Sequence, residues 1–233
     1  MVVDLPVILA ILLVLLTILI FSLRRLLKSS KKCVLLTGLN DSGKTLIYSQ
    51  LIYKRYIMTY TSSQDNFNQY NCDGKELTIV DLPGFHSIRQ QFFEKYKDSS
   101  KGIVYVVDSV TLAKNIRDAA NTLYNILIDP VIMKNKPGLL ILCNKQDQTL
   151  AKGSNIIKSM LEKEMNTLRN TQLNQVKQLD SQEKITNKLG DISKDFSFSS
   201  LYCKVEFAEA CACNKSGPVN LEDLKKWIKK VMN

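Results

Sequence analysis

Short apolar runs alternate along most of this chain with segments whose apolar residues recur at helical spacing. The short runs predict strands, and spacings of three and four residues predict helices between them. Strands are predicted at residues 33–36, 66–72, 76–80, 102–107, 138–143 and 203–208. The second and third are expected to form a hairpin around Asp73 and Gly74. Strands that alternate with helices predict a doubly wound, mostly parallel six-stranded α/β sheet, in which ligands bind at the carboxyl ends of the strands.

One apolar segment is too long and too uniform for such a sheet. Residues 5–23 carry no charge and consist mostly of Leu, Ile and Val. At a rise of about 1.5 Å per residue, roughly 20 residues span a hydrocarbon core of roughly 30 Å. A signal peptide is the alternative, but such peptides usually begin with basic residues, whereas Asp4 precedes this segment. We predict a transmembrane helix at residues 5–23, with residues 1–4 on the luminal or exterior side.

Charge gives the orientation of this predicted anchor. The chain has a net charge of +10 at pH 7. One basic cluster directly follows the apolar segment and consists of Arg24, Arg25, Lys28, Lys31 and Lys32. The positive-inside rule places this side of the anchor in the cytoplasm, where the cluster suits an anionic leaflet. Residues 24–32 are therefore predicted to be a juxtamembrane linker and residues 33–233 a cytosolic domain.

The remaining charges and the cysteines narrow the range of partners. A second basic cluster at residues 225–230 is expected to be a solvated helix face. No stretch interleaves arginines with aromatic residues as a single-strand nucleic-acid platform does, so no direct nucleic-acid partner is expected. The six cysteines form no C-x-x-C pair, which argues against a zinc site and is typical of a reduced cytosolic protein. Cys33, Cys143 and Cys203 are expected in buried strands.

A polar segment separates the last two predicted strands. Residues 152–200 form an insertion rich in lysine and glutamine. Its first part has an amphipathic helical pattern, whereas residues 170–195 have a weaker period, which predicts mostly loop. After the last strand, apolar residues from Leu221 to Val231 predict a closing amphipathic helix.

The first predicted strand leads into GLNDSGKT, which has the G-x-x-x-x-G-K-[ST] form of a phosphate-binding loop. Two glycines allow the backbone N–H groups of such a loop to point at a phosphate. Lys44 is expected to reach the β- and γ-phosphates, and the Thr45 hydroxyl is expected to bind Mg²⁺. The helix that follows adds its N-terminal partial charge. The predicted phosphate-site residues are Gly38, Leu39, Asn40, Asp41, Ser42, Gly43, Lys44 and Thr45.

The third predicted strand ends in DLPG, at a distance from the phosphate loop that is typical of a GTPase. Asp81 is expected to hold Mg²⁺ through water, and the Gly84 N–H to turn toward a γ-phosphate. The polar stretch at 58–64 lies where a GTPase places a threonine that closes over Mg²⁺ and the γ-phosphate. Thr61 is the predicted ligand and Thr59 the alternative, with ordinary turn hydroxyls as the other interpretation.

The fifth predicted strand runs into NKQD, which predicts specificity for guanine. Asp147 can accept hydrogen bonds from the N1–H and exocyclic amine of guanine, a donor pair that adenine lacks. The Asn144 amide can bridge the base and the phosphate loop, and the Lys145 stem can lie along the base plane. Beyond the sixth strand, the Ala212 N–H is expected to contact guanine O6. GTP or GDP with Mg²⁺ is therefore the predicted cofactor.

These motifs, in this order on an anchored chain, resemble the beta subunits of the signal recognition particle receptor, membrane-anchored relatives of the Ras and Arf-type small GTPases. The resemblance covers nearly the whole chain: the apolar span, GLNDSGKT, VDLPGFHSIR, NKQD, EKEMNTLR in the insertion and VEFAEACA near the end. It implies an endoplasmic reticulum membrane location and a heterodimer with the receptor's alpha subunit, which docks on the GTP-bound switch surface. Through that partner, the chain would serve co-translational targeting and act indirectly with the signal recognition particle and the ribosome.

Two positions depart from the pattern of this family. Ras-like enzymes have a water-orienting glutamine directly after the DxxG glycine, and this family commonly has histidine there. Here the position is Phe85, followed by His86. Since phenylalanine cannot orient a water, His86 is the candidate catalytic residue, and a surface or packing role is its alternative. Cys211-Ala212-Cys213 stands where small GTPases usually have Ser-Ala-Lys, which keeps a backbone contact from Ala212 but loses the lysine.

Three functions are compatible with these features. The leading hypothesis is a GTP-gated receptor subunit that holds the alpha subunit at the membrane, with hydrolysis slow or dependent on a partner. The alternative is a membrane-trafficking GTPase of the Arf or Rab type that acts as a hydrolysis-timed switch, although Arf-like proteins use reversible anchors. A constitutive scaffold with a structural nucleotide is the third. The NKQD motif argues against a P-loop kinase or ATPase.

Overall fold

The computed structural model describes residues 12–17, 33–60, 62–178, 189–190, 194–213 and 218–232. The chain separates into two units, residues 1–31 and 32–233. Within the first unit, residues 12–17 are helical. No helix among the described residues is both long enough and apolar enough to cross a membrane. Residues 1–4, the basic linker at 24–32 and most of the predicted span at 5–23 lie outside the described residues.

The second unit is built on a six-stranded sheet with the strand order β2-β3-β1-β4-β5-β6. The strands are β1 (Cys33–Thr37), β2 (Asn66–Cys72), β3 (Lys75–Asp81), β4 (Ser100–Asp108), β5 (Gly138–Asn144) and β6 (Val205–Glu209). Neighbouring strands are parallel except β2 and β3, which are antiparallel. The predicted α/β class is confirmed. The prediction for Cys203 is wrong, because β6 begins two residues later and this side chain is only partly buried.

The turn between β2 and β3 has the conformation expected of a tight hairpin. Asp73 and Gly74 have φ angles of 52° and 77°. Positive φ at both central residues is the geometry of a type I′ turn, whose twist matches that of the strands it joins. This turn fixes the register in which Asn66 lies opposite Asp81, so it positions the residue that begins β2 beside the carboxyl end of β3.

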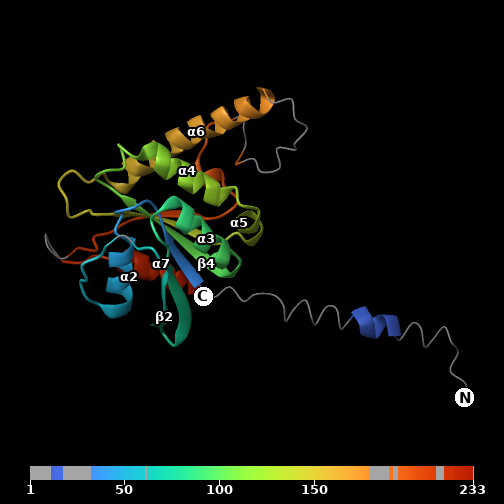
Figure 1. Cartoon of the computed structure of the whole chain (residues 1–233), viewed down its shortest axis with the longest axis horizontal. Helices are drawn as coiled ribbons and strands as arrows, with labels where there is room; N and C mark the ends of the chain where they lie inside the picture. Colours follow the sequence, from blue (N-terminus) through green and yellow to red (C-terminus); the bar gives the residue numbers. More distant parts are fainter. Residues whose placement is uncertain are drawn as a thin grey trace, which may run out of the picture. The chain divides into compact units, whose positions relative to one another are not determined.

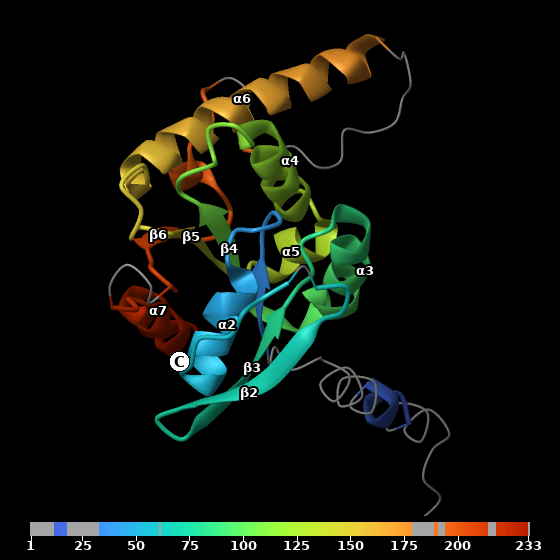
Figure 2. The same ribbon diagram turned by 60° about the vertical axis from the view of Figure 1, so that its left-hand side comes forward.

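Helices cover both faces of the sheet (Figures 1 and 2). They are α2 (Lys44–Tyr53), α3 (His86–Tyr96), α4 (Ile116–Leu127), α5 (Pro130–Asn135), α6 (Ser154–Gln178) and α7 (Glu222–Met232), with 3₁₀ turns η1 (Lys97–Ser99) and η2 (Phe198–Ser200). One hydrophobic cluster joins α3, α4, α5 and α6 to one face of the strands. A second joins α2 and α7 to the other face, as alternate strand residues point to opposite sides.

Two helical segments differ from the prediction. The helix α6 continues through residues 170–178, where mostly loop was predicted. This stretch contains no Gly or Pro, and the good helix formers Gln, Leu and Lys make up more than half of it. The short helix α5 was not predicted at all. Its N-cap is Asp129, whose carboxylate accepts hydrogen bonds from the backbone N–H groups of Val131 and Ile132 at 2.8 and 3.2 Å. Pro130 at the first helical position completes this start signal.

The closing helix α7 is amphipathic as predicted. Its buried side includes Trp227, which is 5% exposed and packs over Gly102 of β4 and Gly138 of β5. Its lysines form surface ion pairs: Lys225 with Glu222, Lys226 with Asp223, Lys229 with Asp73 and Lys230 with Glu206. Exposed pairs of this kind contribute little to stability, so the buried stripe is what attaches α7 to the sheet.

Replacing the indole that attaches α7 should destabilise the domain. We expect Trp227→Ala to lower the free energy of unfolding by about 3–5 kcal/mol, because it leaves a cavity over two strands. Lys226→Ala, on the exposed side of the same helix, should change it by no more than about 0.5 kcal/mol. Urea titration of the full chain in detergent, followed by circular dichroism, measures both. A loss for Trp227→Ala no larger than that of the control would show that α7 is not part of the core.

Candidate functional site

A cavity of about 470 Å³ lies at the carboxyl ends of β1, β3 and β5. The predicted site residues that line it are Asn40, Asp41, Gly43, Lys44, Thr45, Gly84, Asn144, Lys145, Asp147 and Ala212. Three motifs that are far apart in the sequence thus meet at one edge of the sheet, where ligands bind in doubly wound folds. The other members of the phosphate loop are Gly38, Leu39 and Ser42, which join β1 to the cavity wall.

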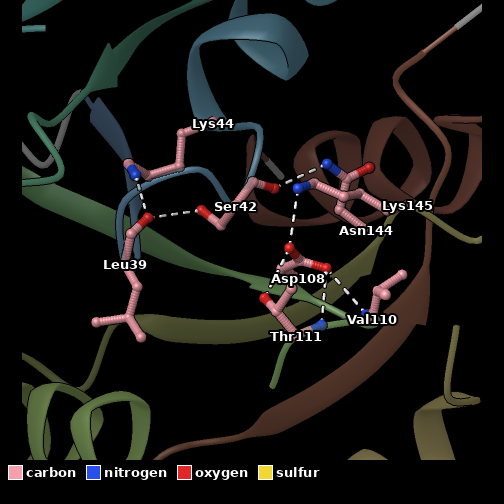
Figure 3. A network of polar contacts seen from close by, with 8 residues as sticks. All are labelled: Leu39, Ser42, Lys44, Asp108, Val110, Thr111, Asn144 and Lys145. Carbon is pink, nitrogen blue, oxygen red and sulfur yellow. Dashed lines mark hydrogen bonds and ion pairs between the residues drawn. The ribbon is translucent and has the colours of Figure 1, made fainter. Parts of the chain in front are cut away.

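The phosphate loop and the NKQD motif are in direct contact. The Asn144 amide nitrogen donates a hydrogen bond to the Ser42 carbonyl at 2.9 Å (Figure 3). Gly43, between this carbonyl and α2, has a φ of 90°, and a Cβ atom there would collide with the Asn144 amide. Only glycine therefore fits this position, both for its backbone conformation and for its close neighbour.

Lys44 carries a buried positive charge at one end of the cavity. Its side chain is 6% exposed, and its ammonium donates a hydrogen bond to the Leu39 carbonyl at 2.7 Å (Figure 3). The Ser42 hydroxyl donates to the same carbonyl at 3.0 Å. Burial lowers the pKa of Lys44 to about 8, although the nearby Asp81 carboxylate opposes this change. An anion in the cavity would favour the charged ammonium, so this end of the cavity fits a phosphate.

Thr45 and Asp81 form a pair of oxygen ligands beside Lys44. The Asp81 carboxylate accepts hydrogen bonds from the Thr45 hydroxyl at 2.8 Å and from the Asn66 amide at 3.2 Å. Its other oxygen, Oδ1, is buried and has no hydrogen-bond partner among the described residues. Burial raises the pKa of Asp81. A hydroxyl next to an unsatisfied carboxylate oxygen is the donor set that suits Mg²⁺.

The threonine predicted to close over this pair cannot be identified from the described residues. Thr61 lies outside them. Thr59 lies in the cavity wall, together with Tyr60 and Ser62. The segment predicted to contain the closing threonine therefore borders the cavity, and the choice between the two threonines stays a prediction.

Asp147, which also lines the cavity, presents an unsatisfied acceptor. Its Oδ1 atom is buried without a hydrogen-bond partner among the described residues. The Cys211 thiol lies nearby, and burial together with the Asp147 carboxylate raises the pKa of that thiol. A buried acceptor of this kind is costly unless a ligand supplies donors. This part of the cavity therefore fits a base with adjacent N–H groups, as guanine has.

The Lys145 side chain is held by an aspartate that the sequence analysis did not assign to the site. Its ammonium pairs with the Asp108 carboxylate at 2.8 Å, which also accepts from the Thr111 hydroxyl at 2.8 Å and the Val110 N–H at 2.9 Å (Figure 3). Burial acts to raise the pKa of Asp108, but the hydrogen bonds from Lys145 and Thr111 outweigh it and the pKa falls. Asp108 ends β4 opposite Asn144 of β5, and its place directly after a buried strand was the available signal.

Two further contacts connect the loops of the base end. The Ala212 N–H, predicted to contact guanine O6, donates to the Asn144 side-chain oxygen at 3.3 Å. A guanine oxygen would have to share or replace this contact. The Gln146 amide donates to the Ser109 hydroxyl and to the Lys152 carbonyl, both at 3.0 Å. As the variable residue of NKQD, Gln146 gave no sequence signal for this role.

The candidate catalytic histidine lies outside the main cavity. His86 begins α3 and lines a neighbouring polar cavity of about 700 Å³, together with Asn40, Gly84 and Arg89. Phe85, directly before it, is 54% exposed. Asn40, Asp41, Gly84 and Lys145 line both cavities, so the cavity that contains His86 adjoins the main one.

Comparison with known proteins identifies the family. The family model for the signal recognition particle receptor beta subunit matches residues 29–205. The signal recognition particle receptor subunit beta of Homo sapiens is 44% identical over an aligned length of 233 residues. The alignment covers 97% of this chain and 86% of the human protein.

Solved structures agree with this assignment. A chain of the mammalian SRP receptor structure is 42% identical, with a TM-score of 0.75, and the match covers 86% of this chain and 100% of that chain. A chain of the SRb-GTP/SRX complex from Chaetomium thermophilum is 20% identical, with a TM-score of 0.64 over 86% of this chain and 98% of that chain, and shows the shared fold alone. The chain therefore belongs to the family of signal recognition particle receptor beta subunits, small GTPases of the Arf-like type.

Proposed function

We propose that this chain binds GTP and GDP with Mg²⁺ and, in its GTP form, holds the receptor's alpha subunit at the endoplasmic reticulum membrane for co-translational targeting. One observation carries the proposal: the walls of a single cavity contain both the buried ammonium of Lys44 and the carboxylate of Asp147, which has an unsatisfied buried oxygen. A guanine nucleotide has an anionic phosphate chain at one end and adjacent N–H donors at the other.

Each part of the nucleotide has a group in this chain that would hold it. Lys44 and the backbone N–H groups of the phosphate loop would bind the phosphates. The Thr45 hydroxyl would bind Mg²⁺ directly and Asp81 through water, and the bound ion would neutralise phosphate charge. Asp147 would accept hydrogen bonds from the base, while the ion pair between Lys145 and Asp108 keeps the lysine stem in place.

Exposed apolar side chains on the segment before β2, in β2 and after Gly84 support a protein partner. Met58, Tyr60, Phe67 and Phe85 are 71%, 82%, 61% and 54% exposed. Tyr60 also lines the cavity, and Phe85 follows the DxxG glycine. Contiguous patches of exposed apolar side chains mark protein-binding surfaces, and we infer that these four side chains contribute to one. The related complex from Chaetomium thermophilum is named as SRb-GTP with SRX, which supports a partner that binds the GTP form.

The membrane part of the proposal rests on sequence and family. We infer a single transmembrane helix at residues 5–23, a luminal N-terminus at 1–4 and a basic linker at 24–32 that places the GTPase domain in the cytosol. Membership of the receptor family supports the endoplasmic reticulum as the location.

The residues after Gly84 favour the hypothesis of a GTP-gated receptor subunit over that of a hydrolysis-timed switch. Phe85 has no polar group with which to orient a water, and His86, the single histidine of the chain, lines the adjoining cavity and not the main one. We therefore expect slow or partner-dependent hydrolysis, with His86 as the candidate catalytic residue.

The decisive test compares two nucleotide states of the same chain. We expect the full chain in detergent to bind the N-terminal domain of the alpha subunit at least about tenfold tighter with a non-hydrolysable GTP analogue than with GDP, a coupling of about 1.4 kcal/mol. Phe67→Ser should weaken binding of the GTP form, because it removes an exposed ring of the proposed surface. Ile156→Ser, which removes an exposed apolar side chain from α6, is the matched control. Equal affinities in the two nucleotide states would contradict a GTP-gated subunit.

The proposed Mg²⁺ site predicts a selective effect of one hydroxyl. We expect Thr45→Val to reduce the gain in GDP affinity from Mg²⁺ over EDTA by about tenfold, because the variant lacks the metal ligand. Thr111→Val removes an equally short hydrogen bond to an aspartate, also 2.8 Å, and should leave the Mg²⁺ effect unchanged. Calorimetry of the full chain in detergent measures both. An unchanged Mg²⁺ effect in Thr45→Val would exclude this hydroxyl as a ligand.

A further inference from the structure

A buried arginine connects three parts of the site. It is the last residue of VDLPGFHSIR, but the sequence analysis gave it no role. Arg89 on α3 is 6% exposed. Its Nη1 atom donates hydrogen bonds to the Gly84 carbonyl at 2.8 Å and to the Gly38 carbonyl at 3.1 Å. Its Nη2 atom donates to the Thr122 hydroxyl of α4 at 3.1 Å. One guanidinium thus joins the DxxG glycine, the first residue of the phosphate loop and a helix on the covering layer.

This arrangement holds the turn after Gly84 from two directions. The guanidinium fixes the Gly84 carbonyl, and the Arg89 backbone N–H donates to the Phe85 carbonyl at 2.8 Å. The carbonyl and the N–H of Gly84 belong to the two peptide groups that flank its Cα atom. Since glycine can rotate about both adjoining bonds, a contact that fixes one peptide group narrows the directions open to the other.

The charge of Arg89 is not balanced by a carboxylate. Its hydrogen-bond partners are two carbonyls and a hydroxyl, and no carboxylate of the described residues forms an ion pair with it. Burial lowers the pKa of Arg89. An isolated buried cation is expensive in free energy, and a well-packed apolar residue would cost less. A purely structural role therefore explains the side chain poorly.

The same charge acts on the phosphate end of the cavity. After burial and the opposing Asp81 carboxylate, the positive charge of Arg89 is a further cause that lowers the pKa of Lys44. Two cations close enough to repel each other share a region that a polyanion would stabilise. The third phosphate of GTP adds negative charge where the Gly84 N–H is expected to bind it.

We propose that Arg89 is a positioning residue for recognition of the γ-phosphate: it holds the Gly84 turn against the start of the phosphate loop, so that the Gly84 N–H faces the nucleotide. This inference rests on the proposed function, since it assumes that the cavity binds GTP. It assigns to Arg89 an effect on GTP that GDP, without the third phosphate, does not share.

The test is the ratio of two affinities measured on the full chain in detergent, with Mg²⁺ and without the alpha subunit. A non-hydrolysable GTP analogue and GDP are the two ligands. We expect Arg89→Ala to shift the ratio of their dissociation constants about tenfold against the analogue. Arg89→Lys keeps the charge but lacks the planar fork that reaches two carbonyls, so a shift of about threefold is expected.

Arg169→Ala provides the matched control. Arg169 on α6 is 4% exposed and donates hydrogen bonds to the Asn166 side chain and the Lys194 carbonyl, but it lines no part of the nucleotide cavity. This variant also loses a buried arginine, so the midpoint of its thermal unfolding should fall while the affinity ratio stays constant. If Arg89→Ala does not fold, Arg89→Lys decides alone.

The outcomes separate this inference from the proposed function. Folded Arg89 variants that keep the wild-type ratio of dissociation constants would overturn the positioning role. This holds whether their affinities for the two nucleotides are unchanged or fall equally. Equal binding of the alpha subunit to both nucleotide states of the wild type would instead overturn the proposed gate. Because the affinity ratio is measured without the partner, that second result leaves the test of Arg89 valid.

Discussion

The hydrogen bond from the Asn144 amide to the Ser42 carbonyl is the contact on which the site depends. It joins the loop after β1 to the loop after β5, although β4 lies between these strands in the sheet. Parallel strands in register deliver both loops to one edge, with Asp108 of β4 directly opposite Asn144. Gly43 has no Cβ atom, and this absence lets the two loops approach. The phosphate loop and the NKQD loop therefore form one connected site rather than two separate ones.

The buried charged groups around this contact lack the partners that such groups usually have. Buried side chains normally satisfy one another, yet here Lys44 and Arg89 are cations held mainly by neutral oxygens, while Asp81 and Asp147 each keep a buried oxygen without a described partner. Unsatisfied buried groups cost free energy of folding, so their presence calls for an explanation such as a function. The two cations and Asp81 suit the phosphates of a guanine nucleotide and their metal ion, and Asp147 suits its base. Stability of the domain therefore comes from the two apolar layers on either face of the sheet.

The strands and most of the candidate site residues could be predicted from the sequence, because they depend on residues that are close together in the chain. Buried strands appear as apolar runs, and the residues that directly follow them must lie at the carboxyl edge. Contacts that depend on packing between distant segments gave no such signal. Arg89 lies on a helix of mixed composition, and its partners Gly38 and Thr122 are brought to it only by the folded sheet and α4. The extension of α6 was missed because its last turns have a weak apolar period, although they contain no Gly or Pro that would end a helix.

Base selectivity tests most directly whether this cavity is a guanine-nucleotide site. We would measure the affinities of the full chain in detergent for GDP, ADP and XDP with Mg²⁺, for the wild type and for Asp147→Asn. A site with an unsatisfied acceptor at Asp147 should prefer GDP over ADP by at least about a hundredfold. The variant should lose GDP and gain XDP, because its amide can donate to the second carbonyl of xanthine. Asp223→Asn, an exposed position on α7, should behave like the wild type. Equal affinity of the wild type for GDP and ADP would contradict the assignment of the base end.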